Sequence, residues 1–205
     1  MKFRLFISLI CMFFLPGVSS AAAPKSLAGV TLGTNLSEIS DKVDMSSALP
    51  LYRLEYLAKV SLKPIEGYRS GHVVYGNCKN KGRIVRIKMS YENSSEKFYN
   101  RLHSLLEKRY GKTLEWLGNP FGTLKIWKWS LKGADKNSVS IILEHYEGDD
   151  DSFTSGNSIR LTNTTLVEEE KKCFETKAKQ MPPSKTRRGA DATPDKANFD
   201  WYLPQ

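Results

Sequence analysis

The clearest pattern of hydrophobic and polar positions lies between residues 83 and 111, where it predicts a strand followed by a helix. Residues 83–91 place an apolar side chain at nearly every second position, which is typical of a half-buried strand. Asn93, with Glu96 three residues later, has the pattern of a capping box, and Gly111 can end a helix. The predicted helix has one apolar stripe, made of Phe98, Leu102, Leu105, Leu106 and Tyr110.

The same periodicities divide the rest of the chain into further strands, helices and loops. Strands are expected at residues 51–62, 68–78, 124–131, 138–146 and 158–165. A short helix is expected to carry Leu36, Ile39 and Val43, with Thr34 or Asn35 as its N-cap. A polar helix is expected at residues 166–179, and loops at residues 46–50 and 113–123.

This order of elements predicts an α+β fold. Consecutive strands joined by short turns pair antiparallel, so we expect an antiparallel sheet of about six strands in the order helix-βββ-helix-βββ-helix. The helices are expected to cover one face of this sheet. The arrangement is consistent with two copies of one helix-plus-three-strands unit, although the halves share no evident sequence identity. Residues 24–180 are therefore predicted to form a single domain with one core.

The first residues have the order of a secretory signal peptide. Lys2 and Arg4 precede an apolar run at residues 5–15, and small residues follow at 18–23. We therefore expect residues 1–22 to be a signal peptide, with an uncleaved anchor or a buried first helix as the alternatives. Lipidation at Cys11 is a further alternative. No later stretch is long and apolar enough to predict a transmembrane helix after signal cleavage.

Two cysteines remain after removal of the predicted signal. In an exported chain, Cys78 and Cys173 are expected to form a disulfide bond, with two free buried thiols as the alternative. In the chain-entropy model, a bond that closes a loop of this length contributes up to about 4–5 kcal/mol to stability. The expected location is periplasmic or secreted.

The positive charge is concentrated at the ends of the chain. The formal net charge is +9, of which residues 171–205 contribute eight Lys and Arg against four Asp and Glu. Residues 181–205 are basic and contain several prolines, so they are expected to form a disordered tail. Residues 201–203 are either a short docking motif or an exposed end. A nearly balanced domain in an exported chain argues against nucleic acid as a partner.

The candidate catalytic residues form no recognised motif. His72, His103 and His145 lack the spacing of metal ligands, and the sequence predicts no metal site and no cofactor. The densest polar cluster runs from Glu144 through His145 and Glu147 to residues 149–151. It is interpreted either as a solvated loop or as a set of oxygen ligands for Ca²⁺.

A cluster of indoles is the remaining candidate for binding. The cluster could line a groove for a peptide or a sugar, because indole rings offer a large stacking area. It consists of Trp116, Phe121, Trp127 and Trp129, together with Lys125 and Lys128. Packing of the same side chains between a sheet and a helix is the alternative.

Residues 29–39 read Gly-Val-Thr-Leu-Gly-Thr-Asn-Leu-Ser-Glu-Ile. This stretch resembles the opening of exported BamE-like outer-membrane assembly proteins, in which a short helical segment is followed by a three-stranded antiparallel sheet. The chain differs from that group in its longer body and in its second set of strands. The resemblance implies a small envelope domain that binds or scaffolds.

The leading functional hypothesis is therefore an exported bacterial envelope protein that binds or scaffolds without catalytic activity. Its partner would be an unknown protein or polymer of the cell envelope. One alternative is a hydrolase of wall or extracellular polymer, with its acid from Glu144 or residues 149–151. Another alternative is an inhibitor of a secreted enzyme.

Overall fold

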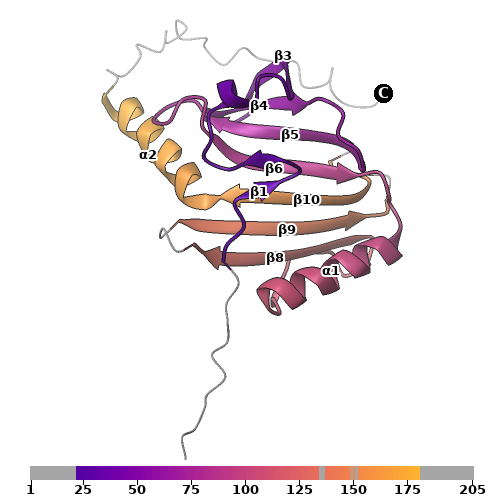
Figure 1. The fold of residues 1–205 in the computed structure, drawn as a ribbon. Coiled ribbons are helices and arrows are strands. Elements are labelled where there is room, and N and C mark those ends of the chain that lie inside the picture. The colour runs from indigo at the N-terminus through magenta and orange to yellow at the C-terminus, as the bar shows by residue number, and fades with distance from the viewer. Residues whose placement is uncertain (1–21, 134–136, 149, 151, 181–205) are drawn as a thin grey trace, which may run out of the picture.

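The computed structural model describes residues 22–133, 137–148, 150 and 152–180. The described chain is mostly β, with one eight-stranded antiparallel sheet, a two-stranded hairpin and two α-helices (Figure 1). The large sheet has the strand order β3-β4-β5-β6-β10-β9-β8-β7. The elements are β1 (Ser26–Leu27), β2 (Val30–Thr31), the 3₁₀ helix η1 (Leu36–Ile39), β3 (Val43–Leu51), β4 (Leu54–Leu62), β5 (Tyr68–Gly76), β6 (Ile84–Tyr91), α1 (Glu96–Tyr110), β7 (Glu115–Trp116), β8 (Leu124–Lys132), β9 (Ser138–Tyr146), β10 (Gly156–Asn163) and α2 (Thr164–Gln180).

The predicted fold class, six strands in the order helix-βββ-helix-βββ-helix, is wrong. Residues 46–50, predicted as a loop, lie in the edge strand β3, where Pro50 is tolerated because an edge strand leaves N–H groups unpaired. The register of β3 against β4 breaks between Asp44 and Leu49, which explains why the sequence of β3 lacks regular alternation. The first predicted helix is only a 3₁₀ turn capped by Asn35, and Val43 already begins β3.

The centre of the sheet is the pairing of β6 with β10, here called the β6–β10 seam. Strands β4, β5 and β6 are followed by α1, and strands β8, β9 and β10 are followed by α2, so each half contributes its third strand to the seam. Along the seam Met89 faces Ile159 and Ile87 faces Leu161. These side chains belong to one continuous core that spans both halves.

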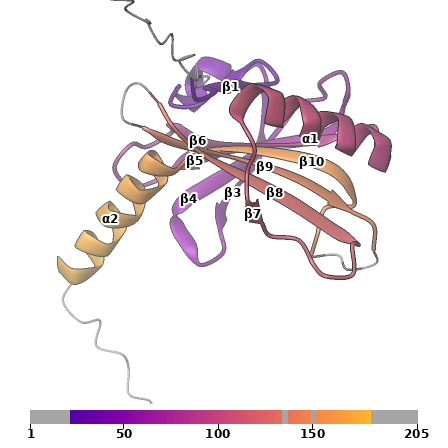
Figure 2. The same cartoon turned by 90° about the horizontal axis from the view of Figure 1, so that it is seen from below.

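The two α-helices lie on opposite faces of the sheet (Figure 2). Helix α1, η1 and the β1–β2 hairpin cover one face, here called the α1 face, where the larger core lies. Helix α2 packs on the other face, the α2 face, where Leu166 meets a smaller cluster of Leu57, Val74 and Val85. The expectation that all helices cover one face is therefore wrong.

Helix α1 follows its predicted stripe with two differences. Its N-cap is Ser95, whose hydroxyl accepts from the Phe98 N–H, whereas the Asn93 side chain accepts from the Ser95 N–H and hydroxyl. Tyr99 is the buried residue of the helix, and Leu105, expected in the stripe, is 54% exposed. The helix ends at Gly111 as predicted, with a φ of +84°.

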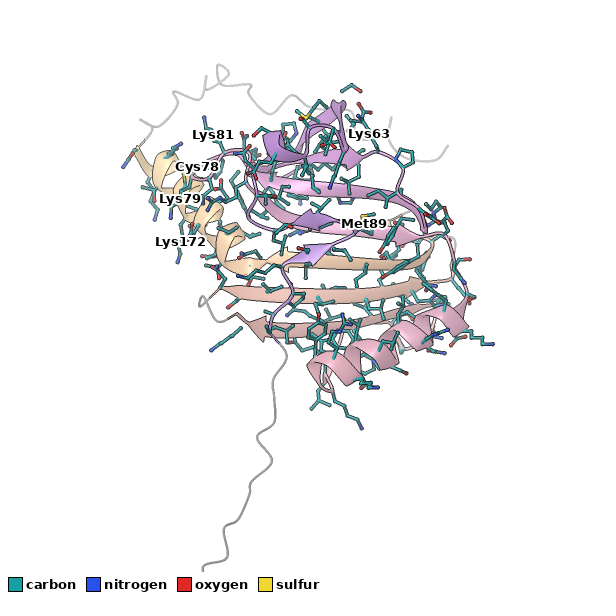
Figure 3. The ribbon with its side chains drawn as sticks, viewed as in Figure 1. Lys63, Cys78, Lys79, Lys81, Met89 and Lys172 are labelled. Carbon is teal, nitrogen blue, oxygen red and sulfur yellow. A yellow bond between two sulfur atoms is a disulfide. The ribbon has the colours of Figure 1, made fainter. Side chains whose placement is uncertain are left out.

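Helix α2 is held by a disulfide bond and by a buried carboxylate. The predicted bond between Cys78 and Cys173 is confirmed, with a sequence separation of 95 residues. One turn earlier, the fully buried Glu170 accepts backbone N–H groups from Cys78, Lys79 and Asn80 at 2.7, 3.1 and 2.5 Å. Figure 3 shows Cys78 and Lys79 beside α2. Within the described residues, neither helix combines the length and the hydropathy that a bilayer-spanning helix needs.

The Glu170 carboxylate should therefore contribute strongly to stability. We expect Glu170→Ala to lower the free energy of unfolding by about 2–4 kcal/mol, because three partly buried N–H groups lose their carboxylate acceptor. Urea denaturation followed by circular dichroism measures this change. The neighbouring Glu169→Gln is the matched control, because Glu169 is partly exposed and pairs with Lys79, so its loss should cost less than about 1 kcal/mol. Equal losses for the two variants would contradict the assigned role of Glu170.

Candidate functional site

The α2 face carries a row of polar side chains across the middle of the sheet. Residues directly opposite one another in antiparallel strands present their side chains on the same face. His72 of β5 faces Lys88 of β6, which in turn faces Arg160 of β10. In the adjacent row Arg86 faces Val74, and Val74 also faces Lys59 of β4. We call Lys59, Arg86, Lys88 and Arg160 the cationic centre.

The cationic centre brings four positive charges together, and Glu144 is the only carboxylate that pairs with them in the described chain. Lys88 and Arg160 are directly opposite across the β6–β10 seam. Burial lowers the pKa of Arg86, and the Arg160 charge lowers it further. Burial likewise lowers the pKa of Lys88, while nearby Glu144 opposes this change. Like charges directly opposite in a sheet destabilise it, so the arrangement is costly for folding.

The pKa of His72 responds to the positive charges of the cationic centre. Its pKa is lowered to about 4, first by burial and then by the charges of Lys88, Lys59, Arg86 and Arg160. The imidazole is therefore neutral at neutral pH, and the cations around it remain the source of the local positive potential. This neutral side chain completes the row without adding a further charge.

Within the described chain, one nitrogen of the cationic centre and one oxygen beside it lack a hydrogen bond. They are the buried Nε of Arg86 and the buried Oε1 of Glu144. Lys88 Nζ donates to the Thr154 hydroxyl at 2.8 Å and lies 3.7 Å from Glu144 Oε1, which is beyond hydrogen-bond distance. A buried N–H group without a partner costs free energy that an incoming acceptor can recover. An anionic group would satisfy both the charge and the Arg86 donor.

The surroundings of the cationic centre are mixed in character. Hydroxyl groups of the same face lie on every side of it, and they belong to Ser61, Ser70, Ser90, Ser140, Ser158 and Thr162. Ile142 continues the row from Arg160 towards Lys128, which pairs with Glu115 at 2.6 Å. Helix α2 bounds the site where Leu166 packs on Val74.

The predicted indole site lies on the opposite, α1 face. Trp129 is 2% exposed, and its Nε1 donates to the Gly111 carbonyl oxygen, so it belongs to the core. Trp127 packs against that core, and Lys125 pairs with Glu96 of α1. Trp116 is 41% exposed and meets Trp127 edge-on with ring centroids 4.9 Å apart. The four residues therefore lie close together, but only Trp116 offers a substantial exposed surface.

The predicted polar cluster is divided between the two faces. Glu144 points to the α2 face beside Lys88, whereas the adjacent His145 points to the α1 face and is 1% exposed. His145 Nδ1 lies 2.7 Å from the Asn157 side-chain oxygen. The Asn157 amide nitrogen donates to the carbonyl oxygens of Asn93 and Ser95. His145 therefore helps hold the start of α1, and it cannot act together with Glu144 on one ligand.

The structure describes the rest of the predicted polar cluster only in part. Residues 149 and 151, also in the predicted cluster, lie outside the described residues. No group of three or more His, Cys, Asp or Glu side chains in the described residues is arranged to hold a metal ion. His103 belongs to α1, and its ring centroid lies 5.2 Å from that of Trp127.

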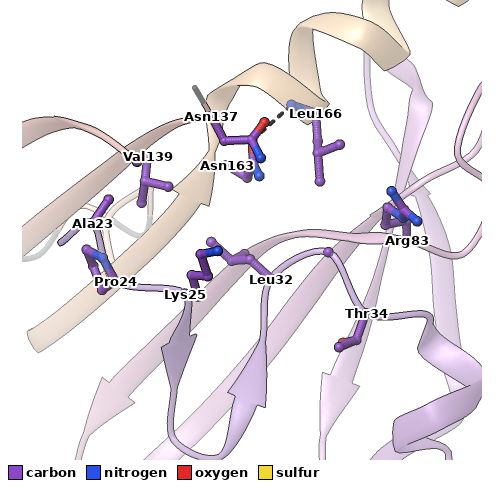
Figure 4. A pocket seen from close by; sticks show the side chains of 12 residues that line it. Ala23, Pro24, Lys25, Leu32, Thr34, Arg83, Asn137, Val139, Asn163 and Leu166 are labelled. Carbon is purple, nitrogen blue, oxygen red and sulfur yellow. Dashed lines mark hydrogen bonds between the residues drawn. The ribbon is translucent and has the colours of Figure 1, made fainter. Parts of the chain in front are cut away.

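A cleft of about 370 Å³ opens where the N-terminal segment meets the start of α2 (Figure 4). Its polar lining is used structurally. The Asn163 side chain accepts from the Leu166 N–H, which caps α2, and Lys25 and Asn137 also interact with other residues. The cleft therefore gives no indication of a ligand, in contrast to the cationic centre.

Sequence reasoning missed the cationic centre because its residues are far apart along the chain. Lys59, Arg86, Lys88 and Arg160 lie on three strands and come together only through the seam. The sequence did indicate that these cations share a face with other polar residues. Arg86 and Lys88 occupy polar positions in the strand with the clearest alternation, and Arg160 occupies such a position in its own strand.

The lowered pKa of His72 should make the stability of the folded chain depend on pH. Below pH 6.5 the unfolded chain takes up a proton at His72 that the folded chain binds only near pH 4, so stability is lost as the pH falls through this window. We expect the stability of the wild-type chain relative to His72→Gln to fall by about 1–3 kcal/mol between pH 7 and pH 4. Urea denaturation at each pH measures the difference, and parallel curves for the two proteins would contradict it.

Removing one charge of the opposed pair should stabilise the fold. We expect Arg160→Met to raise the free energy of unfolding by about 0.5–1 kcal/mol at low salt, because Lys88 and Arg86 lose a like charge. The gain should shrink as salt is added. Arg101→Met, on the exposed surface of α1, is the control and should stay within about 0.5 kcal/mol of the wild type. A clear loss of stability for Arg160→Met would show that Arg160 is a structural residue.

Comparison of the chain with protein-family models, curated proteins and solved structures finds no match. The resemblance of residues 29–39 to BamE-like proteins therefore stays a prediction, and function has to be argued from the geometry above.

Proposed function

We propose that the chain is an exported binding protein without catalytic activity, and that its α2 face binds the acidic surface of a protein partner. The observation that carries this proposal is the cationic centre. Three of its cations, Arg86, Lys88 and Arg160, meet at the seam of the sheet, and Glu144 is the only carboxylate that pairs with them in the described chain. An arrangement that costs stability is understandable where a partner supplies the missing negative charge.

The spacing of the accessible groups favours a protein over a uniform polyanion. Ile142, Glu144 and most of the hydroxyl groups around the cations are buried, so a partner meets separate half-buried cations. The buried Glu144 beside Lys88 would repel an unbroken row of phosphates. The two guanidinium groups match the geometry of carboxylates, which they can bind through two hydrogen bonds each.

The position of the face also supports binding through a broad surface. The cationic centre spans β4, β5, β6 and β10, and strands in a sheet lie about 4.8 Å apart, so it extends over roughly 15 Å. A surface of this width suits a macromolecule better than a small substrate. The hydrolase alternative gains no support, because Glu144 and His145 lie on opposite faces.

Export is supported by two independent features. The disulfide between Cys78 and Cys173 is of a kind that persists in oxidising compartments. The order of charged, apolar and small residues at positions 2–23 is that of a signal peptide. We therefore propose a periplasmic or secreted location, where the partner would also reside.

Charge reversal on the α2 face tests this function. A tagged protein is incubated with extract of its native cell envelope, and the retained proteins are identified by mass spectrometry. We expect Lys88→Glu/Arg160→Glu to weaken retention of one acidic protein at least tenfold, because attraction becomes repulsion. Lys97→Glu/Arg101→Glu on exposed α1 positions is the matched control and should retain the partner.

Salt and folding controls complete the test. The bound protein should be released by about 0.5 M NaCl, since charge attraction at a partly exposed site is screened. Circular dichroism must show that both double variants fold. Retention that does not change on reversal of Lys88 and Arg160, or retention of an anionic polymer in place of a protein, would contradict the proposal.

A further inference from the structure

A groove lies on the α1 face between α1 and the N-terminal segment. Two hollows of about 520 and 140 Å³ lie along α1 and share Leu106, Arg109 and Ile159 in their linings. The larger hollow extends to Tyr91 and Leu102, and the smaller one extends to Pro24 and Leu27. Because they share three residues, the two hollows are adjacent along α1 over β10, and together they are called the groove here.

The lining of this groove is mostly apolar. Ile159 and Leu161 of β10 and Ile141 of β9 form its floor. Leu102, Leu105 and Leu106 of α1 form one wall. Leu105 is 54% exposed although its neighbours in the stripe pack against the core. The helix therefore presents apolar surface to the groove that the described chain leaves uncovered.

The charged side chains that line the two hollows are both cations. Lys108 and Arg109 are exposed in the last turn of α1, and Arg109 lines both hollows. The Tyr91 ring stacks on that of Tyr68, with ring centroids 5.1 Å apart. An occupant of the larger hollow therefore meets apolar surface next to the two cations.

We propose that this groove binds a long-chain fatty acid, with its carboxylate at Lys108 and Arg109 and its acyl chain along Leu102, Leu105 and Ile159. A charged head on an unbranched chain matches the groove in both respects. A peptide fits less well, because its backbone N–H and carbonyl groups need hydrogen-bond partners that a mostly apolar lining does not supply. This site is independent of the α2 face and of the function proposed for it.

Displacement of fluorescent parinarate from the full mature chain tests the site with palmitate, laurate and octanoate. Each methylene that enters an apolar groove should tighten binding about twofold to fourfold, so we expect palmitate to bind at least about tenfold more tightly than laurate. Hexadecanol, which has the same chain without a charge, should bind at least about tenfold more weakly than palmitate. Equal affinity for palmitate and hexadecanol, or an absence of palmitate binding, would overturn the proposal.

Matched variants place the ligand in this groove. Lys108→Glu/Arg109→Glu should weaken palmitate binding at least tenfold, and Leu105→Asp should do the same by adding a carboxylate beside the chain. Lys97→Glu/Arg101→Glu keeps the same change of charge on α1 outside the groove and should bind palmitate normally. Lys88→Glu/Arg160→Glu should also bind normally, which separates this site from the α2 face. Palmitate binding that is unaffected by the changes at Leu105, Lys108 and Arg109 would overturn the assignment.

Discussion

The antiparallel pairing of β6 with β10 is the interaction on which the rest of the structure depends. Without it, each half would be a four-stranded sheet with an exposed edge, and the core on the α1 face would be divided. The pairing joins residues about seventy positions apart, so its closure entropy has to be offset by contacts such as Met89 with Ile159 and Ile87 with Leu161. These apolar contacts on one face stabilise a seam whose other face carries Lys88 opposite Arg160.

Helix α2 has too little apolar surface to be held on the sheet by hydrophobic packing alone. Leu166 and Val167 pack on the sheet near its start, and the following turns are largely polar. Glu170 and Cys173 then replace hydrophobic packing with a charge-assisted set of hydrogen bonds and a covalent bond to the loop after β5. Gly76 permits this approach, since a Cβ at that position would lie 2.6 Å from the Glu170 carboxyl carbon. The anchored helix ends the cationic centre on one side.

Sequence patterns predicted the parts of this fold that depend on neighbours along the chain. Alternation of apolar and polar residues predicted β6 and β9, and helical periodicity predicted α1. The disulfide was predicted because an exported chain with two cysteines is expected to pair them. β3 was not predicted because Pro50 and the register shift between β3 and β4 interrupt the alternation of its side chains. The cationic centre and the role of Glu170 were not predicted for another reason. Both depend on contacts between residues about 70 to 90 positions apart. A carboxylate in a polar helix gives no local sign that it will be buried.

The period of two along each strand also explains how one sheet can carry two unrelated surfaces. Neighbouring residues such as Glu144 and His145 face opposite sides, so a change at one position leaves the chemistry of the other face intact. His145 therefore helps support α1 through Asn157, while Glu144 lies beside Lys88 on the α2 face. The β6–β10 seam determines both surfaces, because the same two strands carry core residues under α1 and the cations on the α2 face. A substitution that shifted the register of β10 by one residue would exchange Arg160 with Leu161 or Ile159, and it would bury the charge and expose the core together.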